Sequence, residues 1–234
     1  MSKINIYLSI KNISMTQKEK ILDLISLVVV LLMALSSWYF YDSLPEKIIT
    51  HWNISGQPDG WGSRSSMLIL IPAVALLTYL LFRFLPKIDP KKRNYSEFMS
   101  VYKIFQLVII LFFALIFWAM IMVNSGVNLS IGQIVPFLVG CLFIFLGAYF
   151  TKIKPNWFLG IRTPWTLSND VVWQKTHDFG GKTFILGGIL FIISAFLSPS
   201  WIGPLFIVII CLLLSSIVYS YFLYRKIGDK NDQK

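Results

Sequence analysis

Six long apolar runs determine what this chain can fold into. They cover residues 21–40, 67–85, 102–123, 131–150, 183–197 and 205–224, and the short fifth run can be extended by the residues before it. About 20 apolar residues in an α-helix cross the hydrocarbon core of a bilayer, because each residue adds about 1.5 Å. Only 14% of the residues are charged, whereas soluble domains contain about 25%. The sequence therefore predicts an all-α integral membrane protein with six transmembrane helices.

The basic residues are distributed unevenly among the segments that connect these runs. All but two of the 21 lysines and arginines lie before the first run, in the segment 83–103 that joins the second and third runs and includes their ends, between the fourth and fifth, or after the sixth. Basic residues of membrane proteins collect in cytoplasmic segments. We therefore expect both termini in the cytoplasm and the two exceptions, Lys47 and Arg64, outside. This topology accounts for the net charge of +10 without direct nucleic-acid binding.

The same layout divides the chain into parts. We expect a cytoplasmic lead-in (1–20), an N-terminal three-helix region (21–123) with an extracytoplasmic loop (41–66), a C-terminal three-helix region (131–224) with a cytoplasmic loop (151–182), and a polar tail (225–234). A cleaved signal peptide is the competing interpretation of the first run, because Ala34-Leu35-Ser36 resembles a small-x-small cleavage site. The apolar run continues past that site, which favours a retained helix.

The connection from residue 153 to residue 182 concentrates polar and aromatic chemistry in a chain that is otherwise mostly aliphatic. It is about 30 residues long, whereas helix–helix connections usually have a few. A membrane-surface segment, with tryptophans among the lipid headgroups, is one interpretation. It accounts poorly for the compact sequence G-I-R-T-P-W-T at residues 160–166. Within the connection, residues 170–179 predict a short interfacial helix that is capped by Ser168 or Asn169 and loosened at Gly180-Gly181.

The outer connection, residues 41–66, contains the turn dipeptides Ser55-Gly56 and Asp59-Gly60. These dipeptides predict a folded loop rather than a helix. His51 lies in this loop and could hold a divalent ion with Asp59 or Glu46, but one histidine with loosely spaced carboxylates favours a hydrogen-bonded histidine. The other histidine, His177, is expected on the opposite membrane face, so the two cannot share a metal site.

The apolar runs carry little chemistry of their own. Their middle turns contain no ionisable residue, which disfavours an ion-coupled carrier, and we expect Asp23 and Lys103 to reach water at the ends of their helices. Cys141 and Cys211 lie inside apolar runs and are interpreted as small apolar residues. The sequence contains no H-E-x-x-H, no G-x-S-x-G and no phosphate-binding glycine loop. It therefore predicts no enzyme, no cofactor and no metal.

Small residues recur along the fifth run. Gly181, Gly188 and Ala195 are spaced by seven residues, and Gly180, Gly187 and Ser194 repeat beside them. Such a stripe lets a neighbouring helix approach closely in a membrane. We expect this stripe to be structural.

Two segments resemble known families. The first, L-P-E-K-I-I-T-H-W-N-I-S-G-Q-P-D-G-W-G-S-R at residues 44–64, resembles an extracytoplasmic domain of unknown function that often precedes a second membrane region. The second, N-W-F-L-G-I-R-T-P-W-T-L-S-N-D-V-V-W-Q-K-T-H at residues 156–177, resembles the signature of the SdpI family, bacterial immunity proteins against a secreted sporulation-delaying toxin. The matching signature positions are Asn156, Gly160, Arg162, Thr163, Trp165, Thr166, Asn169, Trp173 and His177.

The resemblance implies a multi-pass protein of the bacterial inner membrane that protects the cell from a membrane-active peptide toxin. It also implies that such a protein can hold a small helix-turn-helix repressor at the membrane. The expected partners are then membrane lipid, the secreted toxin and a cytoplasmic repressor. The basic lead-in is not part of the signature. A small-solute or lipid transporter remains the alternative function.

The resemblance also indicates candidate site residues. In the cytoplasmic loop we expect Arg162 to act, held by turns at Gly160 and Pro164, with Trp165 and Trp173 as anchors at the membrane interface. The candidate residues of the outer loop are Pro45, His51, Trp52, Gly56, Asp59, Gly60 and Trp61.

Overall fold

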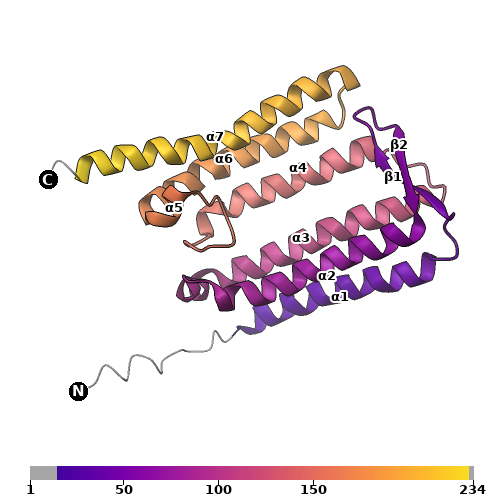
Figure 1. Cartoon of the computed structure of the whole chain (residues 1–234), viewed down its shortest axis with the longest axis horizontal. Helices are drawn as coiled ribbons and strands as arrows, with labels where there is room; N and C mark the ends of the chain where they lie inside the picture. Colours follow the sequence, from indigo (N-terminus) through magenta and orange to yellow (C-terminus); the bar gives the residue numbers. More distant parts are fainter. Residues whose placement is uncertain (1–14, 232–234) are drawn as a thin grey trace.

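The computed structural model describes residues 15–231, so most of the predicted lead-in (1–14) and the last residues of the tail (232–234) lie outside the described residues. Six long helices run side by side (Figure 1). They are α1 (Gln17–Phe40), α2 (Arg64–Ile88), α3 (Tyr95–Asn124), α4 (Ile131–Tyr149), α6 (Asp170–Ser194) and α7 (Pro199–Asn231). All except α6 are long and apolar enough to cross a membrane. The chain is therefore a mostly helical, multi-pass membrane protein.

Short elements occupy the two ends of this bundle. At one end, β1 (Lys47–Trp52) and β2 (Pro58–Ser63) form an antiparallel hairpin. At the other end lie α5 (Pro164–Ser168) and the 3-10 turns η2 (Lys92–Asn94) and η3 (Phe150–Lys152). Figure 1 shows the hairpin and α5 at opposite ends, which we call the hairpin end and the α5 end. The outer connection is folded, as predicted, but the hairpin makes the prediction of an all-α chain wrong at this place.

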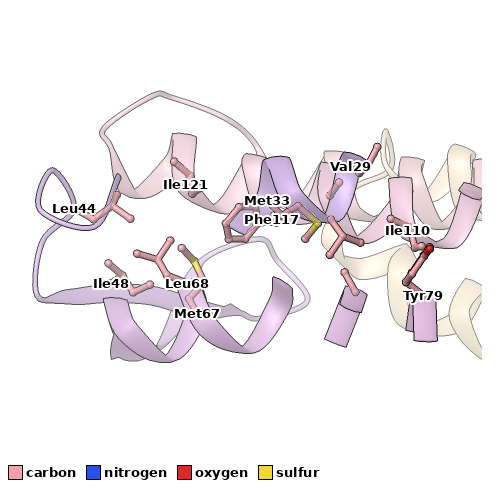
Figure 2. Packing of buried hydrophobic residues seen from close by; sticks show 13 residues of the cluster. Val29, Met33, Leu44, Ile48, Met67, Leu68, Tyr79, Ile110, Phe117 and Ile121 are labelled. Atoms are coloured by element: carbon pink, nitrogen blue, oxygen red, sulfur yellow. The ribbon is translucent and has the colours of Figure 1, made fainter. Parts of the chain in front are cut away.

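The helices form two groups of three. In the first group, α1, α2 and α3 enclose an apolar cluster that includes Met33, Leu68 and Phe117, and that extends to Ile48 of the hairpin (Figure 2). In the second group, α6 lies between α4 and α7 (Figure 1). A second cluster at the α5 end joins the groups, because Tyr95 and Tyr102 of α3 pack there with Trp173 of α6.

Glycines set the spacing inside the second group. A Cβ on Gly188 of α6 would lie 2.6 Å from the carbonyl oxygen of Gly140 in α4, and a Cβ on Gly147 would lie 2.5 Å from that of Gly181. The two backbones are therefore in direct contact, which only residues without a Cβ permit. The prediction that the small-residue stripe brings a neighbour close is confirmed for Gly181 and Gly188.

The prediction of a separate interfacial helix at residues 170–179 is wrong. Helix α6 begins at Asp170 and continues without interruption through Gly180 and Gly181 to Ser194. Its predicted cap is present, since the Asn169 side chain accepts hydrogen bonds from the N–H groups of Val171 and Val172. A glycine inside a helix costs about 1 kcal/mol, and here the close packing of these glycines offsets that cost.

The prediction that Asp23 and Lys103 reach water is also wrong. Both are buried, and Lys103 Nζ lies 2.6 Å from Asp23 Oδ1. Gln106 accepts a second hydrogen bond from Lys103, and Arg83 of α2 donates to Asp23. A buried charge is tolerated when it is paired and hydrogen-bonded. This cluster therefore ties α1, α2 and α3 together near the α5 end.

Candidate functional site

The loop of residues 153–163 follows η3 and is shaped by one buried amide. Asn156 is fully buried, and its Nδ2 donates to the carbonyl oxygens of Lys154 and Leu159. Its Oδ1 accepts hydrogen bonds from the N–H groups of Phe158 and Leu159. An asparagine side chain has two donors and a carbonyl oxygen with two lone pairs, so every capacity is used here. Asn156 is therefore the centre around which this loop folds.

The other end of the loop rests on His177 of α6. Ile161 donates its N–H to His177 Nε2 at 3.0 Å, and His177 Nδ1 in turn donates to the carbonyl oxygen of Trp173 at 2.8 Å. Gly160 precedes this contact with φ +106, and a Cβ on it would lie 2.3 Å from His177 Nε2. Glycine is required at this position for both its backbone angle and its missing side chain.

The hydrogen bonds of His177 define its charge. The residue lies in the first turns of α6, and only 1% of it is exposed. Nε2 accepts the hydrogen bond from Ile161 and so carries no proton, which makes the imidazole neutral.

Thr163, Pro164 and Thr166 build the start of α5. Thr163 caps the helix, Pro164 occupies its first turn, and the hydroxyl of Thr166 accepts a hydrogen bond from the Thr163 N–H. Thr166 also donates to the carbonyl oxygen of Ile161 at 2.9 Å. The Thr163 hydroxyl lies 3.1 Å from that of Ser220 in α7. These contacts fix α5 between the loop and α7.

Trp173 and Asp89 attach the 153–163 loop to the two helix groups. The Trp173 indole N–H donates to the carbonyl oxygen of Ile153, and the ring stacks on His177 at 4.2 Å between centroids. The expected role of Trp173 as an interface anchor is therefore wrong, because it is buried. Asp89, at the end of α2, accepts hydrogen bonds from the Trp157 N–H and the Tyr95 hydroxyl, both at 2.9 Å.

The exposed members of the site point away from this buried frame. Arg162 is exposed and donates to the carbonyl oxygen of Trp157 at 2.8 Å, and the Trp157 side chain is 47% exposed. Trp165 is half-buried and packs against Tyr221 of α7, with ring centroids 5.0 Å apart. The structure thus joins most signature residues into one buried network and presents Trp157 and Arg162 on its surface.

The candidate residues of the outer loop form the hairpin. His51 Nδ1 hydrogen-bonds to Asp59 across the strands, and Gly60 leaves room for the His51 side chain. No group of three metal-ligating side chains occurs among residues 15–231. Trp61 is more than half exposed, and Pro45 is exposed. Trp52 and Gly56 are half-buried.

The hairpin is held against both helix groups. Asn124, at the end of α3, accepts a hydrogen bond from the Ile49 N–H and donates one to its carbonyl oxygen. Gly56, at the hairpin turn with φ +74, touches Gly132 of α4, where a Cβ on Gly132 would lie 3.0 Å from the Gly56 Cα. The hairpin therefore bridges the two groups at one end of the bundle, as the 153–163 loop does at the other.

Sequence reasoning missed Asp89, Asn124 and Ser220. Each is a polar residue at a helix end or inside an apolar helix, and each makes its contact with a residue more than 50 positions away. The Asp89-Pro90 dipeptide is a turn signal, but it does not identify Trp157 as the partner. Buried polar residues of this kind become recognisable only when the packing is known.

Comparison with known proteins finds similarity over two parts of the chain and over most of its length to one protein. Residues 152–220 match the SdpI/YfhL protein family, and residues 28–76 match a domain of unknown function, DUF1648. The chain is 28% identical over 207 residues to a protein from Bacillus subtilis (strain 168) named "Immunity protein SdpI", a match that covers 88% of this chain and 97% of that protein. No solved structure matches the chain. The chain is therefore similar to the SdpI/YfhL family over residues 152–220 and to DUF1648 over residues 28–76, ahead of that region.

Proposed function

We propose that this protein is a non-enzymatic immunity protein that protects a bacterium from a secreted antimicrobial peptide of the sporulation-delaying type. The observation that carries the proposal is the match to the Bacillus subtilis immunity protein, which extends over 97% of that protein and is not confined to one motif. A match over 207 of 234 residues includes the residues of the hairpin and of the 153–163 loop, so the similarity extends to both ends of the bundle.

We further propose that α6 is the sixth membrane span and that the α5 end faces the cytoplasm of the bacterial inner membrane. The α5 end carries the lysines and arginines of the segment between α2 and α3 and of the 153–163 loop, among them Lys91 and Lys154. The hairpin end carries Lys47 and Arg64. The rule that basic residues stay inside supports this orientation. The hairpin then faces the side from which a secreted peptide arrives.

A second candidate function is signalling through the surface at the α5 end. Trp157 and Arg162 are exposed on a loop whose backbone N–H groups donate hydrogen bonds to the side chains of Asn156 and Asp89. Trp and Arg are the residues that most often dominate protein–protein binding. This surface is suited to a cytoplasmic partner such as a helix-turn-helix repressor that is held at the membrane when toxin is present.

The immunity proposal is tested by survival of a peptide-sensitive bacterium that expresses this chain. The cells are exposed to the sporulation-delaying peptide and to a panel of unrelated bacteriocins. We expect selective rescue from one peptide class. Equal killing with and without the inserted protein contradicts immunity, and protein-dependent uptake or efflux in vesicles would then support the alternative of a small-solute or lipid transporter.

The two functions are separated by substitutions at the exposed surface. We expect Arg162→Ala to abolish recruitment of a fluorescently tagged repressor to the membrane in toxin-treated cells. Arg93→Ala is the matched control, because Arg93 is also an exposed arginine of the α5 end and lies in η2, outside the 153–163 loop. Full recruitment by the Arg162 variant, or uniform cytoplasmic fluorescence with the unaltered protein, counts against signalling. Survival of cells carrying Arg162→Ala and Trp165→Ala shows whether immunity uses the same residues.

A further inference from the structure

A pocket of about 460 Å³ lies at the hairpin end, remote from the 153–163 loop. One wall is the hairpin, with Trp52 and Ile54. The opposite walls come from the second helix group, with Val135 of α4, Phe191 of α6 and Phe206 of α7. The pocket therefore lies between the hairpin and the second helix group, and anything bound in it contacts both.

The residues that line the pocket favour one class of ligand over others. Its deeper walls are aliphatic and aromatic, and its polar groups are mostly those of the hairpin, Thr50, His51 and Asn53. His51 already hydrogen-bonds to Asp59. Among residues 15–231, no lysine, arginine, aspartate or glutamate lines the pocket. A charged or highly polar solute would find no compensation there for lost hydration, whereas apolar side chains would be stabilised by burial.

The volume and the position of the pocket indicate the size of the ligand. Pockets of about 300–1,000 Å³ bind compact ligands, so the present one can hold a few large apolar side chains. The pocket extends from the hairpin to Ile209, about one turn into the apolar run of α7 that begins at residue 205. Its upper part is thus walled by a β-strand with polar groups, and its lower part by membrane helices. An amphipathic peptide at the membrane surface has this same division.

We propose that this pocket binds the apolar side chains of a secreted amphipathic peptide, with the peptide backbone lying along the hairpin. The proposal rests on the proposed immunity function and deepens it by naming the binding site. A lipid acyl chain matches the lower walls only, because to fill the upper part it would have to leave the hydrocarbon core and lie among the polar groups of the hairpin. The peptide matches both parts.

The test uses the full-length protein in nanodiscs of phosphatidylethanolamine and phosphatidylglycerol. The probe is the fluorescently labelled sporulation-delaying peptide, or the panel peptide from which the chain rescues cells. We expect Val135→Trp, which fills the pocket, to weaken binding at least tenfold. Val208→Trp is the matched control, because Val208 is 54% exposed on α7 and outside the lining. The control variant should bind the probe with a dissociation constant within twofold of that of the unaltered protein.

A second variant and a crosslink distinguish a filled pocket from a variant that has lost binding because it misfolds. Ile202→Trp fills the pocket from α7, and a benzophenone amino acid at position 202 should crosslink to the peptide. Unchanged binding by both filled variants, or no binding by the unaltered protein, overturns the proposal. It is also overturned if the filled variants lose only a co-purified lipid. If both filled variants still protect cells fully, the proposal that the peptide binds in this pocket is wrong, and the proposed immunity function is unaffected. If the unaltered protein binds the peptide in the pocket but does not protect cells, the proposed immunity function is wrong and the binding site is retained.

Discussion

At the scale of single residues, the family signature is mostly a buried hydrogen-bonding network. Asn156 satisfies the backbone of the loop, His177 holds the Ile161 N–H, and Thr166 holds the Ile161 carbonyl oxygen. Buried polar groups are costly when unpaired, so these positions tolerate few other residues. The exposed residues Trp157 and Arg162 are free of that constraint and are therefore the ones available for a partner.

Gly160→Ala should destabilise the protein more than Gly126→Ala. Both glycines have positive φ, but a Cβ at Gly160 would lie 2.3 Å from His177 Nε2, whereas one at Gly126 would meet nothing within 4 Å. Backbone strain costs about 1–3 kcal/mol at either site, and only Gly160→Ala adds a clash with a buried ring. Chemical denaturation of the two variants measures the difference. Equal losses in the free energy of unfolding would show that the His177 ring moves away from the added methyl group without cost.

At the scale of elements, the unbroken helix α6 is the part of the fold that organises the second group. It contacts α4 through Gly181 and Gly188, α7 through Gly187, and the 153–163 loop through Trp173 and His177. Its end nearest the hairpin lines the pocket with Phe191. One rigid element thus extends from the proposed peptide site to the buried network at the other end.

Gly188→Ala should separate α4 from α6. The added Cβ would lie 2.6 Å from a backbone oxygen of α4, and overpacking of this kind costs about 1–3 kcal/mol. Gly203→Ala is the control, because it lies in helix α7 with nothing within 4 Å and should be neutral or slightly stabilising. Melting temperatures in the same detergent decide the matter, and an unchanged value for Gly188→Ala would contradict the close packing.

At the scale of the whole molecule, two bridges join the helix groups, one at each end. The hairpin joins them through Asn124 and Gly56, and the 153–163 loop joins them through Asp89. The helices and the folded outer loop could be predicted, because apolar runs and turn dipeptides are local signals. The pairing of Asp23 with Lys103, the burial of Trp173 and the contact of Asp89 with Trp157 could not, since each depends on packing between distant segments.

Asp89→Ala should loosen the bridge at the α5 end. The Trp157 N–H loses its acceptor, so its hydrogen exchange should accelerate at least tenfold. Glu97→Ala is the control, because Glu97 makes an ion pair with Lys154 that is largely exposed and worth less than about 1 kcal/mol. Equal exchange rates in both variants would show that Asp89 does not hold the loop.

The most direct test of the account is the membrane potential of peptide-sensitive cells after the toxic peptide is added. We expect cells that express the inserted protein to keep their potential at a peptide concentration that depolarises control cells, and unrelated pore-forming peptides to depolarise both. Depolarisation at the same rate with and without the protein, for every peptide of the panel, would contradict the claim that this chain protects the membrane.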